Sequence, residues 1–223
     1  LNMVKQSIYD SLLQIMTDKF PFSSDNNDFY SVYVKFRVAE IERMYYKKSP
    51  HRIYIKYLDN KYIHYHNPAY IDFFTAFFNN YLYSGSKQIT KEILHQDINH
   101  LNNYFKLLDD MGKDPILVNE IIREMALIQN LANLFAYYDE FNQNNILSLL
   151  KRLSVTTKFP EHKIMAENKI KSLTNLQVGS KAPEFTAIDI HNNTVSLSGY
   201  KGIYVFLHFF TKDCEECIRE MLI

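Results

Sequence analysis

The chain has 223 residues, and its 25 basic and 25 acidic side chains leave it without net charge at neutral pH. This balance argues against nucleic acid or an anionic membrane surface as a partner, and it favours proteins or small molecules. No apolar run reaches the roughly 18 residues of a membrane span, and the first residues lack the pattern of a signal peptide. The chain begins with Leu1 rather than methionine, which is consistent with upstream sequence that has been removed.

Apolar residues recur at helical spacing from the start of the chain to about Leu176. Two such faces are Val34, Val38, Ile41 and Tyr45, and then Val118, Ile121, Ile122, Met125 and Ile128. Helices are predicted over residues 3–19, 28–47, 145–155 and 160–173. The segment 51–65 alternates in the manner of a strand, and its assignment stays open between strand and helix.

Two Asx-Pro pairs mark expected helix starts, because each places a side-chain acceptor at the N-cap and a proline at the first helical position. Asn67-Pro68 predicts a helix from about Ala69, and Asp114-Pro115 predicts one from about Ile116. Gly112 is expected to end the helix before it. The buried face of that preceding helix is predicted to carry Ile98, Leu101, Phe105 and Leu108.

Two groups of side chains in this helical stretch, one aromatic and one of histidines, each allow two interpretations. The aromatic residues are most simply helix core, or they line a groove for a partner segment; they are Tyr70, Phe73, Phe74, Phe77, Phe78 and Tyr81. His64 and His66 are either the start of a metal site or a surface pair without a ligand. The second reading is favoured, because no carboxylate or cysteine cluster accompanies the two histidines in sequence.

The pattern changes at Val178. Short alternating runs over 185–188 and 194–197, separated by His191-Asn192-Asn193, predict a hairpin. The nearly unbroken apolar run over 203–210 is typical of a strand buried on both faces of a sheet. Because the residues after it supply only the first turns of one helix, we expect this strand to need missing sequence, a second copy or the helical part as its cover.

The only two cysteines of the chain, Cys214 and Cys217, follow this strand. A cysteine in the first turn of a helix lies where free backbone amides and the helix dipole stabilise a thiolate. Cys214 has this position. Cys217 lies about one turn further, close enough to attack a mixed disulfide formed by the first cysteine. The pair is therefore predicted to exchange disulfides.

The segment from about Leu176 to Ile223 resembles the thioredoxin superfamily, and within it the envelope thiol-disulfide reductases of the TlpA and ResA type. The resemblance rests on "VGSKAPEF", then "TVSLSGYKGIYVFLHFF", then C-x-x-C, in this order and spacing. The helical stretch is similar to the region that precedes this domain in Bacteroidetes-type members, through "NPAYIDFFTAFFNNYL" and "FPEHKIMAENKIKSLTNLQVGSKAPEF". The expected fold is thus mostly α, with a multi-helix domain over 1–176 and the incomplete start of a thioredoxin-like α/β domain over 177–223.

The resemblance implies a thiol-disulfide oxidoreductase in the cell envelope, with the periplasm as its expected compartment, that acts on protein disulfides. Cys214 would be the attacking thiol and Cys217 the resolving one, with no metal and no organic cofactor. A membrane reductase would resupply the electrons. The alternative is a binding or scaffold protein in which the helical domain recognises a partner and the thioredoxin-like part is inert.

The chain departs from the family pattern at three points. Asp213 replaces the usual tryptophan, Glu215-Glu216 replace a small residue and a proline, and the loop with the cis-proline is absent. Three acidic groups are expected to raise the pKa of a nearby thiol and to favour a reducing couple. Without the remaining strands and the substrate loop, these 223 residues alone are predicted to be inactive or nearly so.

Other readings of the cysteine pair carry less weight. A zinc site needs four ligands, and no second C-x-x-C or nearby C-x-x-H is present. A structural disulfide or two inert thiols is the more serious alternative. The motif "GSKAPEF" and Thr211 also fit peroxiredoxins, but Leu207 stands where their proline is required. His208 is expected to be a buried core histidine of the strand, and a proton shuttle to Cys217 is the less favoured alternative.

Overall fold

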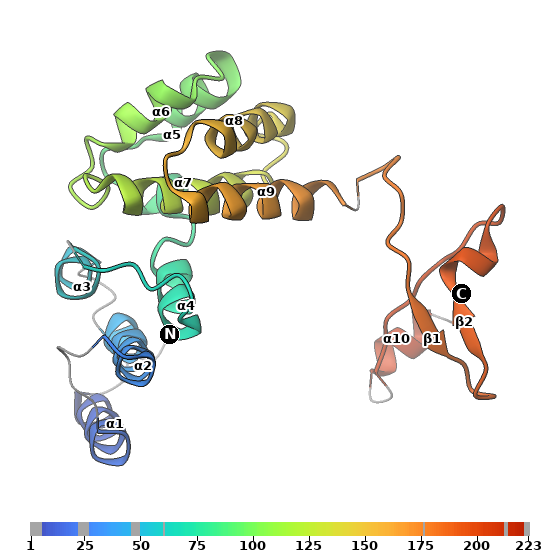
Figure 1. Cartoon of the computed structure of the whole chain (residues 1–223), viewed down its shortest axis with the longest axis horizontal. Coiled ribbons are helices and arrows are strands. Elements are labelled where there is room, and N and C mark those ends of the chain that lie inside the picture. Colours follow the sequence, from blue (N-terminus) through green and yellow to red (C-terminus); the bar gives the residue numbers. More distant parts are fainter. Residues whose placement is uncertain are drawn as a thin grey trace. The chain divides into compact units, whose positions relative to one another are not determined.

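The computed structural model describes residues 6–21, 27–45, 50–59, 61–175, 177–211 and 214–220. It divides into two compact units, Leu1–Thr174 and Asn175–Ile223, and each is described by itself (Figure 1). The first unit is helical and the second holds a small two-stranded sheet, as the sequence predicts for the fold class. None of the helices in the described part of the chain is long and apolar enough to cross a membrane.

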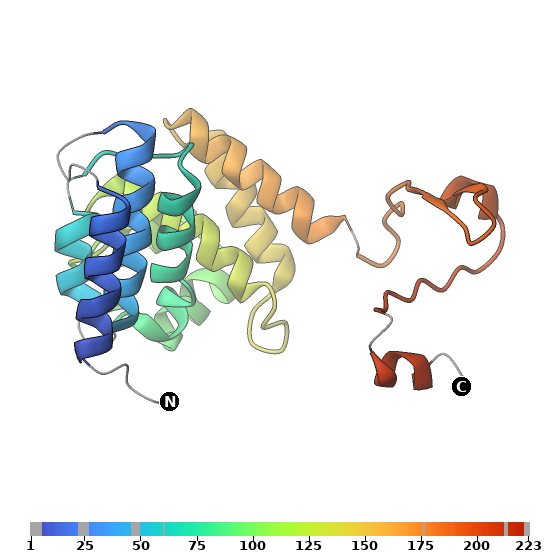
Figure 2. The same cartoon turned by 90° about the horizontal axis from the view of Figure 1, so that it is seen from below.

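The helical unit contains nearly all the helices that the periodicity predicts. In chain order they are α1 (Gln6–Lys19), α2 (Phe29–Tyr45), α3 (Pro50–Tyr57), α4 (Pro68–Phe77), η1 (Tyr81–Gly85), α5 (Lys91–Leu94), η2 (His95–His100), α6 (Tyr104–Met111), α7 (Glu120–Leu134), α8 (Gln143–Thr156) and α9 (Pro160–Thr174). The short elements η1 and η2 are π-helical. Helix α2 packs between α1 and α4, while α7, α8 and α9 pack against one another (Figures 1 and 2).

The open assignment of 51–65 resolves into a helix followed by a loop. Helix α3 ends at Tyr57, and residues 61–64 have no regular structure. Ile53, Tyr54 and Tyr57 are buried on one face of α3, which is the spacing of a helix and not of a strand. The alternation in the sequence is therefore produced by the eight-residue helix α3 and the loop after it.

One of the two Asx-Pro predictions is confirmed and the other is wrong. The Asn67 side chain accepts the N–H of Tyr70 at 3.3 Å, and α4 begins at Pro68. Helix α7, in contrast, begins only at Glu120. Its N-cap is Asn119, whose side chain accepts the N–H groups of the second and third helical residues.

Asp114 does not cap a helix because its carboxylate serves a turn. It accepts the N–H of Ile116 at 2.9 Å, the hydroxyl of Tyr81 at 3.0 Å and the hydroxyl of Ser86. Asp114 is 2% exposed. A buried carboxylate needs such partners, and here they come from η1 and the loop after it rather than from a following helix.

The helix predicted before Gly112 is interrupted. Residues 101–103 separate η2 from α6, and Asn102 has a positive φ of 46°. Because of this break, the predicted face is wrong: Ile98 is buried, but Leu101 and Phe105 are about half exposed. The buried residues of α6 are instead Tyr104, Leu107, Asp110 and Met111. Gly112 follows the last residue of α6, as predicted.

The aromatic residues of 70–81 belong to the core of the helical unit. Five of the six are buried, and Phe77 is half-buried. The Phe36 ring lies 4.8 Å from the Tyr70 ring and 5.4 Å from the Phe73 ring, which ties α2 to α4. The core reading is therefore confirmed, and these side chains do not line an open groove.

The second unit contains the predicted hairpin. Strands β1 (Thr186–Ile188) and β2 (Thr194–Ser196) pair antiparallel with Ala187 opposite Val195. The turn depends on Asp189, whose carboxylate accepts the N–H groups of His191 and Asn193, each at 2.8 Å. These bonds hold the pKa of Asp189 below its usual range. The 3₁₀ turn η3 (Leu197–Tyr200) and helix α10 (Glu215–Glu220) follow.

The buried strand predicted over 203–210 is not present. Residues 204–210 have no strand partner, and Tyr204, Phe206 and Phe209 are exposed by 88% or more. A central strand forms only when neighbouring strands receive its hydrogen bonds and helices cover its faces. In the described part of this unit, β1 and β2 pair with each other and leave this segment without a partner.

Candidate functional site

The structure joins Cys214 and Cys217 in a disulfide, with their Cα atoms 5.3 Å apart. Helix α10 begins at the residue after Cys214, and the N–H of Cys217 donates to the Cys214 sulfur at 3.2 Å. The N–H of Cys214 in turn donates to the carbonyl of Thr211 at 3.1 Å. Cys214 therefore occupies the N-cap position of α10, where an N-cap side chain normally accepts the N–H of the third helical residue.

This position has a chemical consequence for the reduced state. A sulfur at the N-cap receives an amide hydrogen bond and lies at the positive end of the helix dipole, and both favour the thiolate over the thiol. Cys217, at the third helical position, is already within bonding distance of that sulfur. The arrangement is suited to a nucleophile followed by a resolving thiol, although both cysteines are only half-buried.

The acidic residues near the pair are only partly described. Asp213 lies outside the described residues. Glu216 is exposed, with 88% of its side chain accessible, and its carboxylate lies 3.9 Å from the guanidinium of Arg219. Water and this cation weaken the repulsion that Glu216 exerts on a thiolate. The raised thiol pKa expected from the sequence stays a prediction.

His208 is not the fully buried core histidine that the sequence predicts. Its ring is half-buried and lies 6.3 Å from the ring of Phe206 and 6.0 Å from the ring of Phe210. The three side chains share one face of the extended segment, because residues two apart point to the same side. His208 is not fully buried because the segment 204–210 has no strand partner and forms no central strand.

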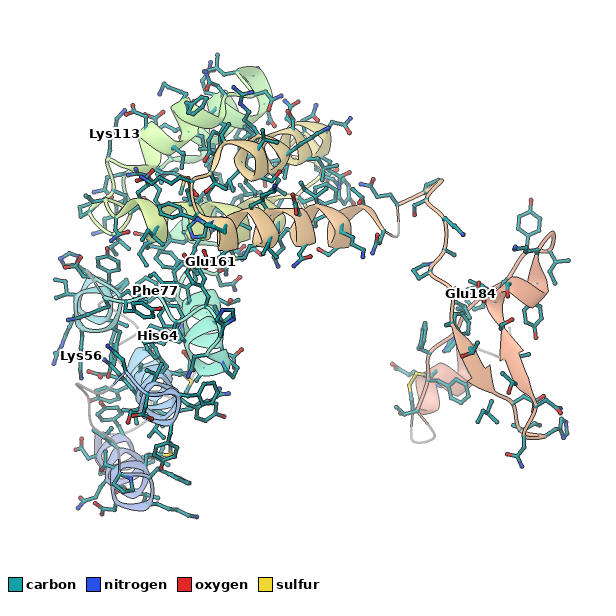
Figure 3. All side chains as sticks on the ribbon, in the orientation of Figure 1. Lys56, His64, Phe77, Lys113, Glu161 and Glu184 are labelled. Carbon is teal, nitrogen blue, oxygen red and sulfur yellow. A yellow bond between two sulfur atoms is a disulfide. The ribbon has the colours of Figure 1, made fainter. Side chains whose placement is uncertain are left out.

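His64 is half-buried and packs against aromatic rings, whereas the sequence predicts a surface pair of His64 and His66. The His64 ring, labelled in Figure 3, lies in the helical unit. It meets the rings of Phe36, Tyr62 and Tyr70 edge-on, with ring centroids between 5.0 and 6.2 Å apart. Burial and the nearby Lys35 lower the pKa of His64, whereas His66 is exposed. Within the described residues, no group of three or more histidine, cysteine or acidic side chains is placed to hold a metal ion.

The helical unit also holds a buried polar network that the sequence patterns do not predict. Its centre is Glu124 of α7, which is 4% exposed and accepts a hydrogen bond from His162 Nδ1 at 2.8 Å. Thr157 and Tyr104 also donate to this carboxylate, at 2.6 and 3.2 Å. The other ring nitrogen of His162 lies 2.9 Å from the Tyr65 hydroxyl. No spacing signal could reveal the network, because Glu124 and His162 lie on different helices.

The network affects the pKa of its members in different directions. Burial raises the pKa of Glu124, but the hydrogen bonds from His162 and Thr157 outweigh burial, so the net pKa is lowered. Burial and nearby acids raise the pKa of Tyr65 to about 12. Glu124 is therefore an ionised acceptor at neutral pH. The polar side chains around Glu124 all have hydrogen-bond partners. This is typical of a network that stabilises the fold.

Comparisons with known proteins match short stretches of the chain. Residues 178–222 match the AhpC/TSA family. A stretch of 48 residues, 22% of this chain, is 44% identical to the thiol-disulfide oxidoreductase ResA of Geobacillus kaustophilus (strain HTA426). The chain spans 28% of the length of that curated relative. No solved structure matches the chain. The match over residues 178–222 and the stretch similar to ResA both support a relationship to the thioredoxin superfamily.

Proposed function

We propose that the protein to which this chain belongs is a thiol-disulfide oxidoreductase that uses Cys214 and Cys217. The observation that carries the proposal is the disulfide at the start of α10, in which the Cys214 sulfur accepts the N–H of Cys217. The partial likeness to ResA supports the same chemistry, because that protein is named for it. The likeness covers a short stretch, so the activity of the whole protein is part of the proposal.

The proposed reaction moves two electrons to a protein disulfide. The Cys214 thiolate attacks one substrate sulfur, forms a mixed disulfide and expels the other substrate sulfur as a thiolate, which takes a proton from water. Cys217 loses its proton and attacks the Cys214 sulfur. This step releases the second substrate thiol and leaves the Cys214–Cys217 disulfide. An external dithiol then returns the pair to its reduced form.

The finer assignments belong to the same proposal. We place the protein among the TlpA and ResA type of the Bacteroidetes, as a reductase that acts in the cell envelope and receives electrons from a membrane reductase. An extracytoplasmic compartment suits a C-x-x-C pair that must meet disulfides. The acidic residues around the cysteines favour the reducing direction, because they oppose the thiolate.

The test is disulfide reduction by the full-length protein. Insulin reduction should be abolished by Cys214→Ser, whereas Cys217→Ser should accumulate a mixed disulfide with the substrate, because the resolving step is lost. Thiol trapping in graded dithiothreitol buffers should give a reversible two-electron transition near the thioredoxin value of about −270 mV. A disulfide that resists reduction in the folded state, or insulin reduction that survives Cys214→Ser, refutes the proposal.

A second candidate is a binding or scaffold protein with an inert thioredoxin-like part. It is favoured by the helical unit, which has its own core and lies outside the AhpC/TSA match. Under this alternative, the intact protein has no disulfide reduction for Cys214→Ser to remove. A peroxide-dependent turnover that requires Cys214 would instead favour a peroxidase over both readings.

A further inference from the structure

An apolar groove lies between the end of α1 and helix α2, which run side by side in the helical unit (Figures 1 and 2). Its volume is about 600 Å³. Met16 of α1 and Phe20, which follows α1, line one side, and Phe29, Tyr30 and Val34 of α2 line the other. Small-molecule sites have about 300–1,000 Å³ and a mostly apolar lining with few polar groups, and this groove has both properties.

The groove exists because α2 is apolar on two faces. One face carries Val32 and Phe36, which are buried in the core of the helical unit. A helix with a second apolar face needs cover there too, and α1 supplies it at the far end of α2, where the Tyr9 and Tyr45 rings stack with centroids 4.3 Å apart. At the near end the described part of the chain leaves the face open, and Phe29 is 63% exposed.

One cation stands in this otherwise apolar lining. Arg37 is the only charged side chain among the described residues that line the groove. Its guanidinium carbon lies 5.0 Å from the centre of the Tyr33 ring, a cation–π contact that holds the charge against the wall of the groove.

The ion pair that Arg37 makes does not cancel this charge. Arg37 Nη2 lies 3.2 Å from Asp72 Oδ2, but the two side chains are 40% and 62% exposed, and such surface pairs contribute little. A guanidinium has five N–H donors, so donors remain for a second anion. Asp72 itself is not among the lining residues. The groove therefore combines an apolar surface with a positive charge.

We propose that the groove binds a free long-chain carboxylate, with its alkyl chain against the apolar lining and its carboxylate on the guanidinium of Arg37. Charge complementarity selects the head group, because the planar guanidinium donates two parallel hydrogen bonds to a carboxylate and cannot do so to an ammonium group. The thioether of Met16 and the aromatic rings suit a flexible alkyl chain, since methionine adapts to irregular apolar surfaces. The site does not involve Cys214 or Cys217, so it stands apart from the proposed disulfide exchange.

The test is isothermal titration calorimetry of the chain with dodecanoate, at concentrations at which dodecanoate forms no micelles. One molecule should bind per chain, and the affinity should rise about three- to fourfold for each CH₂ added from octanoate to dodecanoate. Arg37→Gln should weaken dodecanoate binding about tenfold and leave the binding of dodecanol unchanged, because only the charge-assisted hydrogen bonds are lost. Arg152→Gln, at an exposed position of α8, is the matched control and should change neither.

Three results of this titration overturn the proposal. They are the absence of dodecanoate binding, dodecylammonium binding as tight as that of dodecanoate, and dodecanoate binding that Arg37→Gln leaves unchanged.

A second measurement needs no variant, because it locates the ligand in the unmodified chain. In carbon-13 correlation spectra, the methyl signals of Met16 and Val34 should shift as dodecanoate is added and should show contacts with its alkyl protons. The methyl signal of Met165, which is half-buried on α9, is the matched control and should not move. Shifts at Met165 instead of Met16 overturn the proposal. Shifts at Met16 that follow protein concentration and not dodecanoate also overturn it, because a second copy of the chain then covers the groove.

Discussion

The first prediction concerns Glu124, the centre of the buried network. In Glu124→Ala, the donors of His162, Thr157 and Tyr104 lose an acceptor that lies 2.6 to 3.2 Å from each of them. Each hydrogen bond to a charged group contributes about 1.5–3 kcal/mol, but bonds that share one acceptor do not add fully. Removal of one member of a buried ionic network costs about 3–5 kcal/mol, so we expect a loss of about 4 kcal/mol.

The assay is urea denaturation of the chain at pH 7, followed by far-ultraviolet circular dichroism. A loss of this size should also lower the Tm by about 10 °C for a unit of this length. Glu167→Ala on α9 is the matched control, because Glu167 is exposed, and its free energy of unfolding should change by at most about 0.5 kcal/mol. A loss below about 1 kcal/mol for Glu124→Ala refutes the argument that the network links α7 and α9.

The same site gives a pH dependence with a definite sign. The pKa of Glu124 is lowered in the folded state, so its contribution to stability is present above its ordinary value of 4.5 and is lost as pH falls through the folded-state value. The stability difference between the chain and Glu124→Gln should therefore shrink as pH falls below about 4.5. A difference that stays constant down to about pH 3 contradicts the assigned direction.

Two further substitutions test other polar groups of α7, with the exposed Asn144→Ala as their control. Asn130→Ala should cost about 2–3 kcal/mol in urea denaturation, because the buried Asn130 accepts from the N–H of Leu82 at 3.0 Å and donates to the carbonyl of Phe78 at 3.0 Å. Asn119→Ala removes the N-cap of α7 and should cost about 1 kcal/mol. If neither substitution lowers the free energy of unfolding, the hydrogen bonds of Asn130 and Asn119 do not stabilise the fold, and the argument is wrong.

Local signals predicted those parts of the fold that depend on neighbours in sequence. The hairpin followed from His191-Asn192-Asn193 between alternating runs, and Asn192 indeed has a positive φ of 64°. The Asn67 cap followed in the same way. Asp114-Pro115 carried the same signal and failed, because its carboxylate is bound by Tyr81 and Ser86, which are far away in sequence. A cap signal cannot show that a tertiary partner competes for the same side chain.

In the candidate site, too, local sequence signals could be used for prediction, whereas contacts between distant residues could not. Cys214 and Cys217 could be identified from their spacing and from the helix expected after Thr211, and the sulfur at the N-cap of α10 follows from that placement. The buried network around Glu124 could not be predicted, because Glu124 meets His162 from another helix. The break at residues 101–103 could not be predicted either, because periodicity alone indicates one continuous helix through it.

The last prediction concerns the exposed apolar segment 203–210. Phe206 and Phe209 are each 88% exposed, and the backbone of 204–210 is extended without a strand partner. An apolar, β-prone segment with free backbone groups pairs readily with another such segment. We therefore expect the chain to self-associate as its concentration rises, and burial of each phenylalanine ring would contribute about 1.5–3 kcal/mol to this association.

The double variant Phe206→Lys and Phe209→Lys should stay monomeric at concentrations where the unmodified chain associates, because two like charges oppose pairing of identical segments. Sedimentation velocity at several concentrations measures the change. Tyr138→Lys is the matched control, since Tyr138 is 70% exposed in the helical unit and its substitution should leave association unchanged. If Tyr138→Lys suppresses association as strongly as the double variant does, the contact lies in the helical unit, and the reasoning from the unpaired segment is refuted.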